Sequence, residues 1–236
     1  MEAGDGLRGD NSSWRFQGEV VSQFDDHILK SVPLYKSGHQ LIAQISDYFV
    51  KDDGIFYDLG CSTGSISRIL SARHSSKQNL SFVGIDCEQD MITKALDLSK
   101  NFNNCTFIKE DIVDFPFEKT DFITAYYTIQ FTKPSIRQIL INNVFESLNW
   151  GGAFVMFEKV RGSDARFQDI FTGLYNEFKL DKGYSAEEIL GKTRSLKGVL
   201  EPFSSQANID LLKRAGFIDI IPIMKYVCFE GVLAIK

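Results

Sequence analysis

Residues 55–64 constrain the fold more than any other stretch of the chain. An apolar run there ends in an acidic residue, Asp58, and a glycine-containing turn follows. Residues 65–72 are helix-like, and a second apolar run over 80–85 again ends in an acid, Asp86. Strand, glycine turn, helix, strand and acid, in this order, are typical of a nucleotide-binding βαβ unit. The pattern predicts a parallel sheet that carries a nucleotide site.

The two glycines of the turn, Gly60 and Gly64, indicate what kind of ligand it holds. A dinucleotide site usually reads Gly-x-Gly-x-x-Gly, so that backbone amides can meet a pyrophosphate. Here the turn starts from an acid and has a different glycine spacing. It suits a ligand with a ribose, an adenine and an amino-acid tail but no phosphate, such as S-adenosylmethionine (AdoMet). Glycine lets the backbone turn sharply and approach the ligand, although an ordinary βα turn is the alternative.

Strands and helices alternate along most of the chain. The predicted strands are 55–58, 80–85, 105–108, 121–126 and 153–157, and the predicted helices are 19–29, 38–49, 65–73, 89–101, 135–148 and 206–215. Residues 149–152 are predicted to be a helix stop and turn. Two apolar strands, 218–224 and 227–235, would close the chain as a hairpin.

These elements predict one α/β domain over residues 14–236. Its sheet is expected to be doubly wound, seven-stranded and mostly parallel, with an antiparallel C-terminal edge. Residues 163–202 interrupt the alternation and predict a helical insertion of two or three charged helices. Residues 1–13 are rich in Gly, Asp, Asn and Ser, so we expect them to be disordered.

Composition narrows the function classes. The net charge of −5 argues against a broad nucleic-acid-binding face. The four cysteines lie far apart and form no CxxC pair, which argues against a zinc site or a disulfide framework and fits a reducing cytoplasm. The chain also shows no signal-peptide pattern and no apolar run of membrane-spanning length. We therefore expect a cytoplasmic protein without a metal.

Three acidic residues follow three successive predicted strands. Asp58 could anchor the turn and receive an ammonium group, and Asp86 could accept hydrogen bonds from both ribose hydroxyls. Asp111 could accept from the exocyclic amine of adenine, while Ile112 packs on the ring. Each acid alone could be a solvated loop residue or a helix N-cap. Three of them at the ends of successive strands favour one shared site.

The end of the fourth predicted strand is where a methyl group and its acceptor would meet. Tyr126 lies there and could stack on a ligand, shape the pocket or act through its hydroxyl. Core packing is an equal alternative for Tyr127. The three histidines show no metal-ligand spacing, and His39, near the start of a predicted helix, is a further candidate for catalysis.

Five segments, in order, resemble the carboxy-S-adenosylmethionine synthase (CmoA) family of the class I methyltransferase superfamily. They are 31–35, 58–62, 128–131, 157–159 and 182–185. The glycine turn alone would indicate only an AdoMet-binding fold. The Ser-Val-Pro-x-Tyr and Lys-x-Gly-Tyr-Ser segments are narrower signals, and the resemblance covers most of the chain from about residue 24.

The resemblance implies a class I methyltransferase fold and a homodimer. It also implies conversion of AdoMet and prephenate into carboxy-AdoMet and phenylpyruvate, with a partner enzyme using the product on the wobble uridine of tRNA. The cofactor-binding residues that it implies are Tyr35, Gly60, Cys61, Ser62, Asp86, Asp111 and Ile112. Cys87, next to Asp86, is a further candidate for cofactor binding. Arg194 matches the arginine that holds the carboxylate of carboxy-AdoMet, and a guanidinium suits this task because it pairs with a carboxylate through two parallel hydrogen bonds.

Two departures from the family pattern lie at the reactive end. Tyr126 takes the place of an asparagine that contacts the ligand, and residues 196–198 read Leu-Lys-Gly instead of Leu-Glu-Asn. They favour, as the first hypothesis, an AdoMet-dependent methyltransferase that acts on a small, partly hydrophobic molecule. The alternative, supported by Tyr35 and Arg194, is a carboxy-AdoMet synthase. A third hypothesis is a non-catalytic AdoMet-binding partner subunit. Neither a membrane nor direct nucleic-acid binding is expected.

Overall fold

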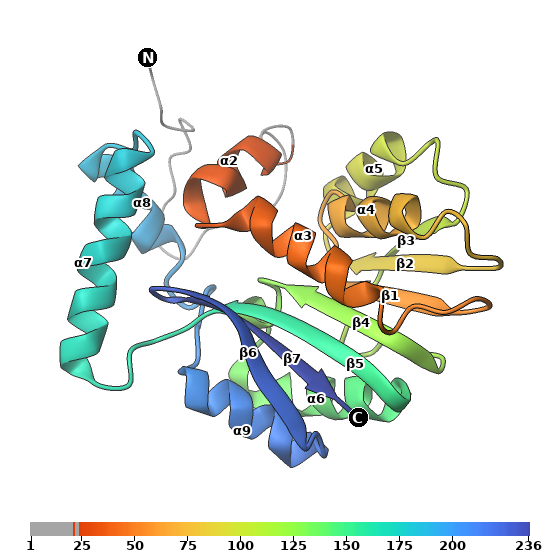
Figure 1. Cartoon of the computed structure of the whole chain (residues 1–236). Helices are drawn as coiled ribbons and strands as arrows, with labels where there is room; N and C mark the ends of the chain where they lie inside the picture. The colour runs from red at the N-terminus through yellow and green to blue at the C-terminus, as the bar shows by residue number, and fades with distance from the viewer. Residues whose placement is uncertain (1–20, 22–23) are drawn as a thin grey trace.

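The computed structural model describes Val21 and residues 24–236, and its centre is a seven-stranded sheet (Figure 1). The strand order is β3-β2-β1-β4-β5-β7-β6. The strands are β1 (Ile55–Leu59), β2 (Ser81–Asp86), β3 (Cys105–Lys109), β4 (Thr120–Tyr126), β5 (Leu148–Lys159), β6 (Asp219–Tyr226) and β7 (Phe229–Ile235). Strands β1 to β5 are parallel, and β7 runs antiparallel to both β5 and β6. The predicted fold class is therefore confirmed.

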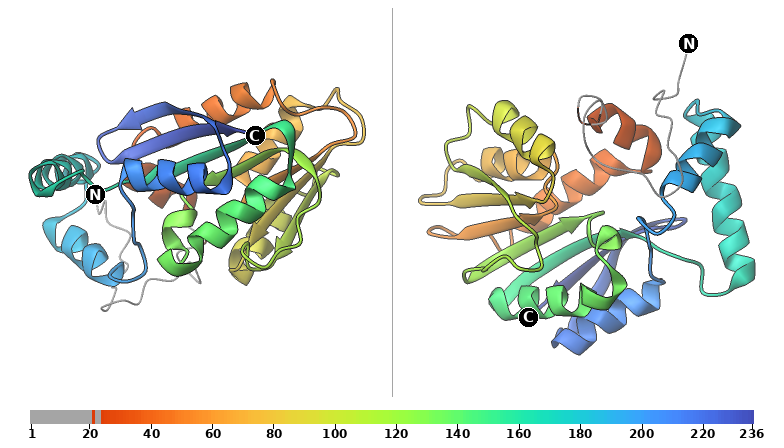
Figure 2. Two further views of the ribbon diagram at one scale, coloured as in Figure 1. Left: turned by 90° about the horizontal axis from the view of Figure 1, so that it is seen from below. Right: turned by 180° about the vertical axis from the view of Figure 1, so that it is seen from behind.

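Helices cover both faces of the sheet (Figures 1 and 2). The helices are α2 (Phe24–Ser31), α3 (Tyr35–Ser46), α4 (Ser65–Arg73), α5 (Gln89–Leu98), α6 (Pro134–Ser147), α7 (Ala165–Asp181), α8 (Ala186–Ser195) and α9 (Ser205–Ala215). Helices α3 and α4 pack on one face, and α6 and α9 pack on the other. Helices α7 and α8 form the insertion and stand at one side of the sheet.

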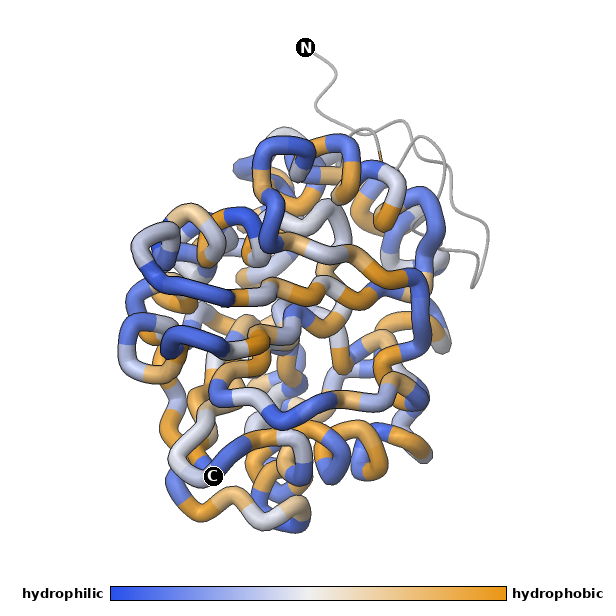
Figure 3. Tube along the Cα trace, turned by 90° about the vertical axis from the view of Figure 1, so that its right-hand side faces the viewer, coloured by the Kyte–Doolittle hydropathy of each residue, from blue (hydrophilic) through white to orange (hydrophobic). Residues whose placement is uncertain are grey.

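The two apolar cores follow from the alternation of side chains along each strand. In β1, Phe56 packs with α3 and α4, whereas Tyr57 and Leu59 pack with α6 and α9. Because helices cover both faces, the central strands β1 and β4 are buried along nearly their whole length, and Figure 3 shows how hydrophobic and hydrophilic stretches are distributed over the chain. This arrangement leaves the carboxyl ends of the parallel strands as the place for a ligand.

Several boundaries differ from the sequence-based expectation. The segment predicted as a turn at 149–152 belongs to β5, because Gly151 N–H donates to Lys236 O at 2.8 Å and Lys236 N–H donates to Gly152 O at 3.0 Å. The C-terminal strand thus extends β5 where a turn was expected. Helix α5 ends at Leu98 rather than at 101. The expected disorder of residues 1–13 and the first residues of the helix predicted at 19–29 lie outside the described residues.

Two further findings concern the described part of the chain. None of its helices combines the length and the apolar character that a membrane span requires. It also contains no cluster of His, Cys, Asp or Glu side chains that could hold a metal ion.

Candidate active site

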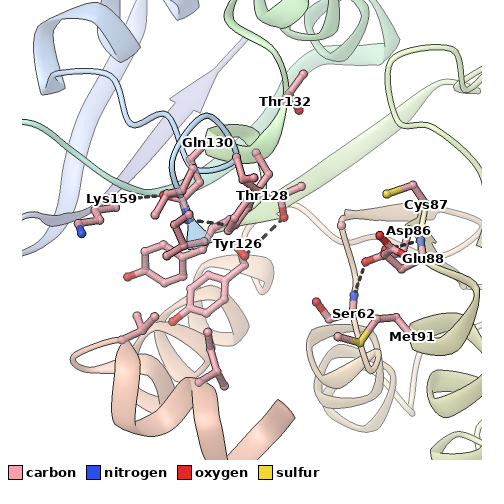
Figure 4. Close-up of a pocket in the computed structure, with 18 of the residues that line it drawn as sticks. Ser62, Asp86, Cys87, Glu88, Met91, Tyr126, Thr128, Gln130, Thr132 and Lys159 are labelled. Atoms are coloured by element: carbon pink, nitrogen blue, oxygen red, sulfur yellow. Dashed lines mark hydrogen bonds between the residues drawn. The ribbon is translucent and has the colours of Figure 1, made fainter. Parts of the chain in front are cut away.

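A cavity of about 520 Å³ opens at the carboxyl ends of the parallel strands (Figure 4). Its volume is within the range of small-molecule sites, roughly 300–1,000 Å³. The glycine turn and the residues that follow β2, β3 and β4 form one part of its wall. The other part comes from α2, α7, α8 and the end of β5. The cavity therefore joins the sheet edge to the helical insertion.

The glycine turn has left-handed backbone at Gly60 and Gly64, with φ of 68° and 75°. A Cβ on Gly60 would lie 2.3 Å from Thr128 Cγ2, so only glycine lets the chain after β4 close over the turn. Gly60 and Ser62 line the cavity, as expected. Gly64 instead packs against Phe107, where a Cβ would approach to 2.5 Å. Gly64 therefore lets α4 begin at a point where the ring of Phe107 leaves no room for a Cβ.

Asp86 lies at the end of β2 and faces the cavity. Ser62 N–H donates to its Oδ2 and Glu88 N–H to its Oδ1, both at 2.9 Å. Burial raises the pKa of this carboxyl, and the two backbone donors oppose the shift. Its position is therefore fixed by the turn and by the start of α5. Such a carboxylate can accept hydrogen bonds from the two hydroxyls of a ribose.

Asp111 and Ile112 follow β3 and also line the cavity. Asp111 is exposed and holds its own turn by accepting from Val113 N–H at 2.9 Å, while Ile112 is buried. Cys87 lines the cavity too, and burial together with Asp86 raises the pKa of its thiol to about 11. An apolar surface beside an exposed carboxylate suits an adenine ring and its amine.

Two of the expected residues lie beneath the turn. Asp58 is buried and accepts from Thr124 Oγ1 and Ser67 Oγ, each at 3.2 Å. Burial raises its pKa to about 7. Asp58 and Cys61 line a small second cavity rather than the main one. Tyr35 lines both cavities and connects them.

Tyr126 forms the wall between the two cavities. Its hydroxyl donates to Tyr35 O at 2.6 Å and occupies the space above Gly38, where a Cβ would come within 2.1 Å of Tyr126 Oη. Burial raises the pKa of this phenol well above its usual range. It stays protonated with its hydroxyl engaged, so it is suited to shaping the pocket rather than to acting as a base.

His39 packs beside Tyr126 and does not line the main cavity. Its ring centroid lies 4.6 Å from that of Tyr35 and 4.8 Å from that of Tyr126. Burial lowers its pKa to about 4, so the imidazole is neutral near pH 7. The geometry makes it part of an aromatic cluster.

Arg194 does not line the cavity of its chain. It lies on α8 and is exposed, whereas Lys192, two residues earlier on the same helix, does line the cavity. Lys192 Nζ donates to Ser31 Oγ at 2.9 Å and contacts His27. The sequence analysis did not single out Lys192.

The turn after β4 is held by residues of two of the family-like segments. Ile129 N–H donates to Glu158 Oε1 at 2.9 Å, and Lys159 N–H donates to Gln130 Oε1 at 2.8 Å. Burial raises the pKa of Glu158 to about 8, against the opposing effect of Arg137. Residues 128–131 and 157–159, far apart in sequence, therefore build one wall of the cavity together.

Charge is divided along the cavity. The acidic residues that line it follow β2 and β3, and they are Asp86, Glu88, Glu110 and Asp111. Three lysines also line it. Lys133 lies just before α6, whereas Lys159 and Lys192 lie at the end away from Asp86 and Glu88, as Figure 4 shows for Lys159. The cavity can thus bind a nucleoside at its acidic end and an anion at its basic end.

Comparisons with known proteins agree with this geometry. Residues 56–152 match the model of a methyltransferase domain. Among solved structures of low sequence identity, which bear on the fold alone, human N-acetylserotonin methyltransferase in complex with S-adenosylmethionine has a TM-score of 0.61 at 15% identity, covering 93% of this chain and 56% of the other. A SAM-dependent methyltransferase from Aquifex aeolicus has a TM-score of 0.60 at 15% identity, covering 93% and 98%.

Relatives of higher identity show the family. A carboxy-S-adenosyl-L-methionine synthase of Staphylococcus epidermidis is 36% identical over 224 residues, covering 94% of this chain and 97% of the relative. The synthase of Desulfotalea psychrophila is 35% identical over 231 residues, covering 97% and 94%. The protein is thus an AdoMet-dependent enzyme with AdoMet or carboxy-AdoMet as its ligand, and the hypothesis of a non-catalytic subunit loses its support. The chain belongs to the carboxy-S-adenosyl-L-methionine synthase family.

Proposed function

We propose that this protein makes carboxy-AdoMet from AdoMet and a small carboxylated molecule. The division of charge along the cavity carries this proposal, because Lys159 and Lys192 line the end opposite Asp86. A carboxylate is attracted to that end and repelled by the other. The name of the relatives points to the same product, and the family resemblance implies prephenate as the second substrate.

The acidic end is suited to AdoMet, which supplies an activated one-carbon group on its sulfonium. Asp86 would accept from the ribose hydroxyls, and Ile112 would pack on the adenine beside Asp111. Asp58, beneath the turn, would attract the ammonium of the amino-acid tail. These roles use one carboxylate at or near the carboxyl end of each of three parallel strands.

The basic end is suited to an anion that also carries a ring. Tyr175 lines it, and Lys159 Nζ lies 4.2 Å from the centroid of that ring. Catalysis then rests on holding two reactants in contact and on excluding water, which alone can lower a barrier by about 7–11 kcal/mol. Tyr126 and Tyr127 contribute a buried aromatic wall.

The new carbon–carbon bond replaces a C–H bond of the AdoMet methyl group. When prephenate loses its ring carboxyl group as CO2, its ring hydroxyl leaves as hydroxide, which takes up the methyl proton and departs as water with phenylpyruvate. Neither Tyr126 nor Tyr127 therefore has to act as a base.

Methyl transfer to a partly hydrophobic acceptor is the second candidate, and Tyr126 favours it. The family has an asparagine at this place, whose amide contacts the ligand. Here the Tyr126 hydroxyl donates to Tyr35 O. This position therefore contributes an aromatic ring to the pocket wall and no amide that could contact the ligand. An enzyme on the same scaffold could then present the methyl group to an acceptor without a carboxylate.

We also propose that the protein is a homodimer, as the resemblance implies. Helix α7 supports this, because Phe167, Ile170 and Leu174 lie on one side of it with 46–50% of their surfaces exposed. Apolar side chains at this spacing form a stripe that a second copy would bury. Sedimentation at several concentrations tests this, and a monomer at all of them would contradict it.

The reaction is tested by incubating the purified protein with AdoMet and prephenate and analysing the nucleotides by mass spectrometry. We expect carboxy-AdoMet, formed only when both substrates and the protein are present. AdoMet that stays unchanged with prephenate but is converted to S-adenosylhomocysteine with an aromatic acceptor would establish the second candidate instead.

A further inference from the structure

We propose that Lys192, Ser31 and His27 form an anion subsite that binds a carboxylate of the second substrate. This inference deepens the proposed function and rests on it. The three side chains line the cavity at the end away from Asp86. None of them is among the residues that the family resemblance assigns to the ligand.

The three side chains converge from two helices. Lys192 Nζ, on α8, donates to Ser31 Oγ at 2.9 Å and contacts His27 Nε2, both on α2. Ser31 Oγ is also 3.4 Å from His27 Nε2. An ammonium, a hydroxyl and an imidazole thus share one small volume of the cavity wall. The ammonium of Lys192 and the hydroxyl of Ser31 can donate to the two oxygens of a carboxylate, while His27 Nε2, which accepts from the ammonium, holds Lys192 in place.

Tyr184 positions this group from behind. Its hydroxyl lies 3.1 Å from Ser31 Oγ and 3.4 Å from His27 Nδ1, and it is buried without lining the cavity. Ser31 and Tyr184 belong to the two narrowest family-like segments, 31–35 and 182–185. Tyr35 of the first segment lines the cavity, and the contact between Ser31 and Tyr184 gives the second segment a role at the same site.

A second pair of lysines makes the surroundings basic. The Tyr175 hydroxyl donates to Ser31 O at 2.8 Å, and Lys159 and Lys179 lie 4.2 and 4.4 Å from the centroid of the Tyr175 ring. Lys159 lines the cavity together with Lys192, and Lys179 lies on the ring of Tyr175 without lining it. In a partly buried site their attraction for an anion is stronger than in water.

The same contacts also tie α2 to α8, so a structural role must be separated from a binding role. The probes are phenylpyruvate and its carboxamide, which differ at the carboxyl group. Each is titrated calorimetrically into the AdoMet-saturated wild type and into Lys192→Met. The matched control is Lys213→Met, because Lys213 is exposed on α9 and does not line the cavity. Lys192→Arg tests rescue by a conserved charge.

We expect the wild type to prefer the acid over the amide, and Lys192→Met to weaken binding of the acid by roughly 10- to 100-fold, as for loss of a charge-assisted hydrogen bond. Binding of the amide and AdoMet affinity should stay as in the wild type. Lys192→Arg should recover most of the preference, and Lys213→Met should not change it.

Three results would overturn the subsite: no preference for the acid in the wild type, a preference that survives Lys192→Met, or a parallel loss of acid, amide and thermal stability. Failure of the proposed reaction looks different. A wild type that forms no carboxy-AdoMet, yet loses its acid preference in Lys192→Met, would retain the subsite and reject carboxyl transfer. Carboxy-AdoMet formation with an unchanged KM for prephenate in Lys192→Met would reject the subsite alone.

Discussion

The two ends of the cavity are built in different ways. At the acidic end, Ser62, Asp86 and Asp111 each follow a parallel strand or its turn, so neighbouring strands bring them together. At the basic end, Ser31, Lys159 and Lys192 come from three distant segments that meet only in the folded chain. On the proposed function, residues placed by the sheet bind AdoMet, whereas residues of the helical insertion and the N-terminal helix select the second substrate.

The largest expected effect is at the acidic end. Asp86→Ala should weaken AdoMet binding by about 3 kcal/mol or more, since two hydrogen bonds to a charged group are lost. It also leaves the Ser62 and Glu88 amides without their acceptor. Calorimetry measures the affinity, and Asp97→Ala, an exposed acid on α5, is the matched control. An unaltered AdoMet affinity in Asp86→Ala would contradict the proposal that AdoMet binds at the acidic end of the cavity.

Gly38→Ala tests the wall between the ends. Its Cβ would lie 2.1 Å from Tyr126 Oη, so we expect a loss of about 1–3 kcal/mol in the free energy of unfolding, as for overpacking. Tyr126→Phe removes the nearest atom, and the cost of Gly38→Ala should be smaller in that background. Denaturant unfolding of the four variants gives the coupling energy. Simple additivity would show that Tyr126 does not depend on Gly38.

Asp58 predicts a pH dependence at the acidic end. Its pKa is raised to about 7, so the carboxyl must lose a proton to receive the AdoMet ammonium. Affinity should therefore be full above pH 7 and fall by up to about 1.4 kcal/mol per pH unit below it. His39, with a pKa near 4, stays neutral over this window.

The control for this dependence is Asp58→Asn, which should bind AdoMet more weakly and with a flat profile from pH 5 to 8, a window taken from about two units below the raised pKa to one above it. Calorimetric titrations at each pH measure both curves. If the AdoMet affinity of the wild type did not change with pH, Asp58 would have no role in binding the ligand.

The smallest expected effect is that of Arg194→Ala. Arg194 is exposed and does not line the cavity, so stability should change by less than about 0.5 kcal/mol. The affinities of Arg194→Ala for AdoMet and carboxy-AdoMet should stay as in the wild type. Lys192→Met, in contrast, should bind the carboxylate of the second substrate more weakly. If Arg194→Ala lost carboxy-AdoMet binding but kept AdoMet binding, the Arg194 guanidinium would hold the carboxylate, as the family resemblance implies.

The acidic end could be predicted from the sequence because its residues follow the strand pattern. Asp86 and Asp111 lie where a parallel sheet must bring them. Lys192 could not be predicted in this way, since residues two apart on a helix point to nearly opposite sides and only packing decides which faces the cavity. The partnership of Tyr126 with Gly38 is equally invisible in sequence, because it joins β4 to α3 across the fold.

Transfer of a labelled carboxyl group tests the central claim most directly. The protein is incubated with AdoMet and carbon-13-labelled prephenate, and the nucleotide product is analysed by mass spectrometry. The division of charge between Asp86 and Lys192 predicts carboxy-AdoMet that carries the label. Turnover that yields only unlabelled products, or no turnover with an AdoMet-saturated protein, would contradict the claim that the basic end receives the carboxyl donor.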